Sequence, residues 1–165
     1  MRVRVSLTAA LLVAPVVEWN VPVPFASATT PSTDRAEFVV RELLSNTYRA
    51  FEFRREEAVY DRLATSVAGE QLAQIYLQQR QALEIEERGG ARARMETVNV
   101  ETMRRLSPVD GGFRVECVWT VAGSVSHFGH RHYRQNRYVA RVVVRADGGS
   151  WKIVSLDVLD EKRVL

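Results

Sequence analysis

The chain has 165 residues, 46% of them hydrophobic and 26% charged, a balance that predicts one folded domain and excludes a chain that is disordered throughout. A single cysteine, Cys117, excludes an intramolecular disulfide and a cysteine-cluster zinc finger. The net charge is only +3, and the 23 basic residues are interleaved with 20 acidic ones, so we expect no nucleic-acid partner.

The first 28 residues have the features of an export signal. Two arginines precede an apolar stretch over residues 6–17, and residues 26–28 read Ala-Ser-Ala, an A-x-A cleavage pattern. We expect residues 1–28 to be a signal peptide or a membrane-anchoring segment, and residues 29–33 to be a linker. Pro15 interrupts the apolar stretch, which leaves open the alternative of a buried N-terminal segment in a cytoplasmic protein.

Apolar residues then follow a helical spacing up to residue 90. The first predicted helix is capped by Thr33 or Asp34. A second is predicted over residues 56–68 and a third over residues 70–88, because glycines follow both segments. Three tyrosines of these helices are predicted to lie in the core: Tyr48, Tyr60 and Tyr76.

After residue 90 the period of the pattern changes from helical to alternating, which predicts four strands over residues 95–106, 113–122, 132–146 and 151–159. In the second strand the alternation directs five apolar side chains to one face: Phe113, Val115, Cys117, Trp119 and Val121. The sequence therefore predicts an α+β domain over residues 34–165, with three helices packed on one curved face of a four-stranded antiparallel sheet.

This order of elements, closed by a hairpin over residues 141–154 with the sequence RVVVRADGGSWKIV, resembles the NTF2-like cone fold over about residues 34–160. With a hydrophobic segment in front, the chain is similar to the periplasmic VirB8-like branch, whose members serve as assembly scaffolds. The resemblance implies a periplasmic or otherwise extracytoplasmic protein, membrane association through residues 1–28, and a protein partner or self-association. The chain does not match the Asp/His dyad of the isomerase-like and SnoaL-like branches, so their chemistry is not implied.

The three histidines fall within six residues, at His127, His130 and His132. If the third strand has already begun at His130, His130 and His132 point to the same face, and a bend at Gly129 brings His127 back toward them. Imidazoles in such a set bind zinc or copper, so one hypothesis is a metal site made by the three histidines. The alternative is an exposed hairpin tip whose histidines form local hydrogen bonds.

The same third strand is predicted to change from apolar to polar along one face. Tyr138 and Ala140 lie on the helix side, and the row continues backwards through polar residues: Asn136, Arg134, His132 and His130. In a cone fold this row, with Tyr138, lines the mouth of a ligand pocket, where Arg134 and Asn136 are suited to a carboxylate or a phosphate. If the strand extends beyond the helices, the same residues are simply solvated.

Two functions are compatible with these patterns. The chain lacks glycine-rich phosphate loops and the HExxH and GxSxG motifs, which removes the nucleotide-binding, metalloprotease and α/β-hydrolase classes that these motifs mark. The first function is a non-enzymatic, extracytoplasmic binding or assembly module, which needs no catalytic residues and agrees with the export signal. The alternative is a small-molecule or metal-binding domain that uses His127, His130 and His132, with hydrolase or lyase activity left open. A metal titration separates the two functions.

Overall fold

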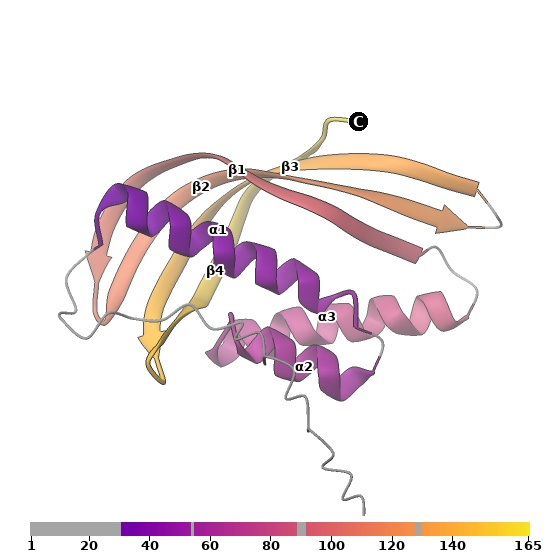
Figure 1. Cartoon of the computed structure of the whole chain (residues 1–165), viewed down its shortest axis with the longest axis horizontal. Coiled ribbons are helices and arrows are strands. Elements are labelled where there is room, and N and C mark those ends of the chain that lie inside the picture. Colours follow the sequence, from indigo (N-terminus) through magenta and orange to yellow (C-terminus); the bar gives the residue numbers. More distant parts are fainter. Residues whose placement is uncertain (1–30, 54, 89–91, 128–129) are drawn as a thin grey trace, which may run out of the picture.

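A computed structural model describes residues 31–53, 55–88, 92–127 and 130–165. Three helices precede four strands (Figure 1): α1 (Thr33–Ala50), α2 (Glu56–Ala64), α3 (Gly69–Glu87), β1 (Arg92–Val109), β2 (Gly112–His127), β3 (His130–Asp147) and β4 (Ser150–Arg163). The helices pack on an open antiparallel sheet of order β1-β2-β3-β4, so the predicted α+β class and the four-stranded meander are confirmed. The predicted segment of residues 6–17 lies outside the described residues.

The core lies between α1 and the inner face of the sheet. Val39 and Leu43 of α1 are fully buried, as are Val115 and Cys117 of β2 and Val142 of β3. These residues recur every four positions in the helix and every two in the strands, so each element turns one apolar face inward. Trp119, predicted to face the same way, is 1% exposed and confirms the predicted alternation of β2.

Helix α1 begins one residue earlier than the sequence indicated. The side chain of Ser32 accepts a hydrogen bond of 3.4 Å from the backbone N–H of Arg35, so Ser32 is the N-cap instead of Thr33 or Asp34. Ser32, Thr33 and Asp34 are all residue types that favour an N-cap, so the sequence alone did not distinguish them. Ser32 is the N-cap because the helix begins at Thr33.

Helix α2 ends at Ala64, four residues before the predicted end. The chain leaves the helix there because its backbone pairs with β4: Ile153 N–H donates to the Ser66 carbonyl at 2.8 Å, and Ala68 N–H donates to the Ile153 carbonyl at 2.9 Å. A third bond, from the Leu156 N–H to the Gln71 side chain at 2.9 Å, ties the start of α3 to the same edge. These bonds cover the first half of the β4 edge, which would otherwise expose unpaired backbone groups.

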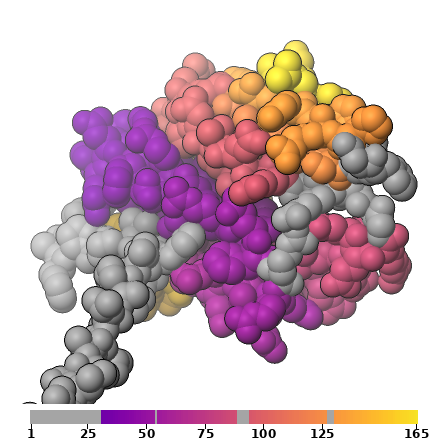
Figure 2. Space-filling view, turned by 45° about the vertical axis from the view of Figure 1, so that its right-hand side comes forward, coloured from indigo at the N-terminus to yellow at the C-terminus, as the bar shows by residue number. Residues whose placement is uncertain are grey.

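Helix α3 packs on α2 and on β4 near its start, and Leu72 is its only buried residue. Tyr76, predicted to lie in the core, is half-buried, as are Ile75 and Leu83. In Figures 1 and 2 the second half of α3 lies below the early part of β3 as a separate layer. No helix within the described ranges is long and apolar enough to span a membrane.

Candidate functional site

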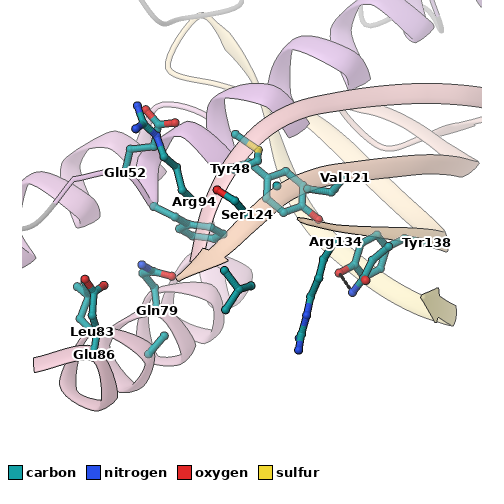
Figure 3. Close-up of a pocket in the computed structure, with 16 residues that line it drawn as sticks. Tyr48, Glu52, Gln79, Leu83, Glu86, Arg94, Val121, Ser124, Arg134 and Tyr138 are labelled. Carbon is teal, nitrogen blue, oxygen red and sulfur yellow. Dashed lines mark hydrogen bonds between the residues drawn. The ribbon is translucent and has the colours of Figure 1, made fainter. Parts of the chain in front are cut away.

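A cavity of about 540 Å³ lies between α3 and the inner face of the sheet, where β1, β2 and β3 extend past the packed part of the molecule (Figure 3). We call it the α3–sheet groove. It is open to solvent, and its volume falls within the range of small-ligand and peptide-side-chain pockets. The groove exists because α3 is held to the sheet at its first turns only, so its second half does not close on the strands.

Apolar side chains form the floor and one wall of the groove. Phe51 follows α1, Leu83 comes from α3, and Met95, Val121 and Val125 come from the sheet. Each of these five residues is half-buried, so each keeps apolar surface that a ligand can cover.

The sheet wall is closed by a tight approach of β1 to β2. Gly123 lies on this wall, and a Cβ atom there would overlap the carbonyl oxygen of Arg94. Glycine therefore permits the backbone of β1 to come close, which brings Arg94 into the groove lining.

Two tyrosines at the floor belong to a hydrogen-bonded network. The indole N–H of Trp119 donates to the Tyr48 hydroxyl at 3.3 Å, and the Trp119 ring stacks on Tyr138 with 5.3 Å between ring centroids. Asn136 Nδ2 donates to the Tyr138 hydroxyl at 3.2 Å and to the Glu161 carboxylate at 2.9 Å. The network joins α1, β2, β3 and the end of β4, so it holds both phenols in fixed orientations.

Burial raises the pKa of Tyr48 well above its ordinary value, and burial also raises the pKa of Tyr138. Both phenols are therefore neutral near pH 7, and each has a hydroxyl proton to donate. Among the described residues the Tyr48 hydroxyl accepts a hydrogen bond from Trp119 and donates none, which leaves its own proton available toward the cavity.

The rim of the groove carries charge of both signs. Arg94 and Arg134 come from the sheet, Glu86 comes from α3, and Glu52 follows α1. Figure 3 shows Glu52 and Arg94 at one end of the groove, whereas Arg134 lies apart from both carboxylates, on the side of Tyr138. Among the described residues Arg134 has no ion-pair partner.

The structure divides the row of residues predicted along β3. Arg134, Asn136 and Tyr138 line the groove, which corresponds to the pocket alternative. His130 and His132 are exposed and lie farther along β3, outside the groove lining, which corresponds to the solvated alternative. The row is divided because the first residues of β3 lie at the far end of the sheet, beyond the part that the helices cover.

The predicted metal site is described in part. The backbone of His127 pairs with that of His130, and Val125 pairs with His132, but the side chain of His127 lies outside the described residues. In the described part of the chain, no three side chains of histidine, cysteine, aspartate or glutamate lie close enough to hold a metal ion.

Sequence reasoning missed Tyr48 and Leu83 as groove residues. Tyr48 was predicted to lie in the core, and it does pack there, but one side of it lines the cavity. Tyr60, also predicted in the core, is 44% exposed, so that prediction was wrong. Glu161, at the acidic end of β4, accepts a hydrogen bond from Asn136.

No protein-family model matches the chain, and no curated protein matches it. Among solved structures, the chain is similar to the crystal structure of the intermembrane space region of chloroplast protein ARC6, with a TM-score of 0.54 and 20% sequence identity. The match covers 82% of this chain and 98% of that chain. At this identity the similarity shows a shared fold.

Proposed function

We propose that the chain is a non-enzymatic binding module of an extracytoplasmic assembly, and that it holds a segment of a partner protein in the α3–sheet groove. The observation that carries the proposal is the groove itself, a cavity of about 540 Å³ with an apolar floor, two neutral phenols and a charged rim. A partner segment that buries this floor gains hydrophobic free energy, and the rim charges select its orientation.

The extracytoplasmic location rests on two separate observations. Arg2 and Arg4 precede an apolar stretch over residues 6–17, and an A-x-A pattern follows at residues 26–28, which is the order of features in an export signal. One solved structure to which the chain is similar is that of the intermembrane space region of a chloroplast protein, which supports a location of the same kind. The order of elements also supports an NTF2-like fold with the organisation of the VirB8-like branch, which is part of the same proposal.

The test is site-specific photo-cross-linking of the full chain in its native host. A benzophenone amino acid replaces Leu83, which lines the groove, and in a second strain it replaces Leu77, which lies on α3 outside the groove lining and is 50% exposed. We expect a cross-linked adduct of one defined mass from position 83 and not from position 77. The proposal is wrong if position 83 gives no adduct, or if both positions give the same adducts.

The alternative of a metal site at His127, His130 and His132 stays a prediction from the sequence. It concerns the hairpin end of β2 and β3 and not the groove, so it is tested separately.

A further inference from the structure

We infer that the α3–sheet groove selects a partner segment that carries an acidic side chain next to apolar ones, with Arg134 and Tyr48 as the groups that recognise the carboxylate. The inference rests on the proposed function, because it names the chemistry of the segment that the same groove holds.

Arg134 is the first reason. It is exposed at the groove, it has no ion-pair partner among the described residues, and in Figure 3 it lies apart from Glu52 and Glu86. A guanidinium that forms no ion pair within the protein is available to bind the carboxylate of a ligand. Glu52 and Arg94 lie at the opposite end of the groove. The Glu161 carboxylate, at the Tyr138 end, accepts a hydrogen bond from Asn136 and forms no ion pair with Arg134, so the guanidinium stays available to a ligand.

The second reason is the phenol of Tyr48. The Trp119 indole N–H fixes the Tyr48 hydroxyl oxygen, and the hydroxyl proton has no acceptor among the described residues. In Figure 3 the hydroxyl is directed toward the side of Tyr138 and Arg134. The neutral Tyr48 hydroxyl can donate a hydrogen bond to a carboxylate, and the Arg134 guanidinium supplies the positive charge that the hydroxyl lacks.

The third reason is the surrounding surface. Val121 from β2 and Leu83 from α3 lie in the same lining as Arg134, so a residue next to the acidic one meets an apolar wall. A fully polar segment would leave this apolar wall exposed to water. A segment with an acidic residue between apolar ones places its carboxylate at Arg134 and its apolar side chains on the wall.

The network at the floor supplies a reporter of binding. The indole N–H of Trp119 is bonded to Tyr48, so a ligand that binds the Tyr48 hydroxyl shifts the Trp119 indole resonance. Trp151 is buried beside Phe113, and neither residue belongs to the groove lining, so its indole resonance serves as the internal reference. The two resonances are assigned from the Trp151→Phe and Trp19→Phe variants.

The experiment titrates the ¹⁵N-labelled full chain with two blocked pentapeptides, acetylated and amidated. One has a glutamate with leucines on both sides, and the other has glutamine in place of glutamate. We expect the glutamate peptide to shift the Trp119 resonance and to bind about tenfold more tightly than the glutamine peptide, because a charge-assisted bond is lost in the latter. The Trp151 resonance stays in place with both peptides.

Three variants decide which groups read the carboxylate. Arg134→Gln should remove the preference for glutamate and keep the weak binding of both peptides, and Tyr48→Phe should reduce the preference. Arg131→Gln is the matched control, because Arg131 is an exposed arginine of the same strand that does not line the groove. An unchanged Trp151 resonance verifies the fold of each variant.

The inference is overturned if the two peptides bind equally, or if Arg134→Gln keeps the full preference for glutamate. Those results would leave the position-specific cross-link from Leu83 unaffected. Loss of that cross-link would instead contradict the proposed function, so the two failures are distinguishable.

Discussion

At the scale of single residues, Cys117 shows how burial decides chemistry. The thiol lies in the core between α1 and β2, fully shielded from solvent. Burial, with a smaller contribution from the Glu37 carboxylate, raises the pKa of the thiol to about 12. A thiol that stays protonated is a weak nucleophile. The alternation of β2 predicts the inward position of Cys117 from which this follows.

The raised pKa of Cys117 makes the stability of the protein depend on pH in alkaline solution. Between the ordinary pKa of 9.0 and about 12, the unfolded chain releases the thiol proton and the folded chain keeps it. The free energy of unfolding therefore falls as pH rises, by about 1.4 kcal/mol per pH unit from this one proton. The thiol contributes nothing to the slope below that range.

Cys117→Val removes the titrating group at similar volume. We expect the variant to lose stability less steeply than the parent chain between about pH 9 and about pH 10.5, as measured by urea unfolding at several pH values. The tyrosines act in the same way in both proteins, so their effect cancels in the comparison. Parallel pH profiles would contradict the assignment of a buried, protonated thiol.

At the scale of elements, the ends of the helices and the partition of β3 needed the structure. Apolar spacing located every helix and strand, because each element buries one face. The end of α2 at Ala64 depends on hydrogen bonds to Ile153, nearly ninety positions away along the chain, which no local pattern contains. The groove likewise depends on how far α3 stands from the sheet, a distance that the periodicity of α3 does not encode.

The sequence predicted part of the candidate site. Strand parity placed Arg134, Asn136 and Tyr138 on the helix side of β3, and all three line the groove. The parity did not predict where along β3 the helices begin to cover it, so His130 and His132 were grouped with them. Tyr48 was read as a core residue because its position on α1 is equally consistent with the core and with the groove floor.

Strand β1 carries a strained residue that offers a test at the element scale. Arg105 has a φ of 55°, in the left-handed region, at an irregularity where the pairing of β1 with β2 shifts between Arg104 and Ser107. A residue with a Cβ atom is disfavoured there by roughly 1–2 kcal/mol. Its ion pair with Glu116 is largely exposed and contributes little.

We expect Arg105→Gly to raise the free energy of unfolding by about 0.5–1 kcal/mol, since relief of the strain exceeds the extra entropy of glycine in the unfolded chain. Arg104→Gly is the matched control, because Arg104 has no positive φ and its replacement should cost about 0.5–1 kcal/mol. Urea unfolding of both variants gives the two values. Equal losses in both would show that Arg105 is not strained.

At the scale of the whole molecule, His130 and His132 lie outside the groove lining, although His132 pairs with Val125 at its edge, and the groove and the histidines belong to two different proposals. The groove needs no metal. The histidine alternative does, and it has a definite dependence on pH, because only neutral imidazole binds a metal ion.

If the histidines form a site, zinc or copper should bind the full chain with an affinity that weakens in acidic solution, because protonated imidazole is not a metal ligand. Calorimetric titration with ZnCl₂ at two pH values measures this, beside the variant in which His127, His130 and His132 are all replaced by alanine. Tight binding that the triple variant loses supports the site. Equal affinity in the parent chain and the variant refutes it.

The central claim is that the α3–sheet groove holds the partner, and filling the groove tests it most directly. Ala82 lines the groove, whereas Ala73 is an exposed position of the same helix outside the lining. With the cross-linker at Val125, on the opposite wall, the yield of the adduct is measured in Ala82→Trp and in Ala73→Trp. The account predicts that Ala82→Trp lowers the yield about tenfold or more, and that Ala73→Trp leaves it unchanged. Equal yields from both variants would contradict it.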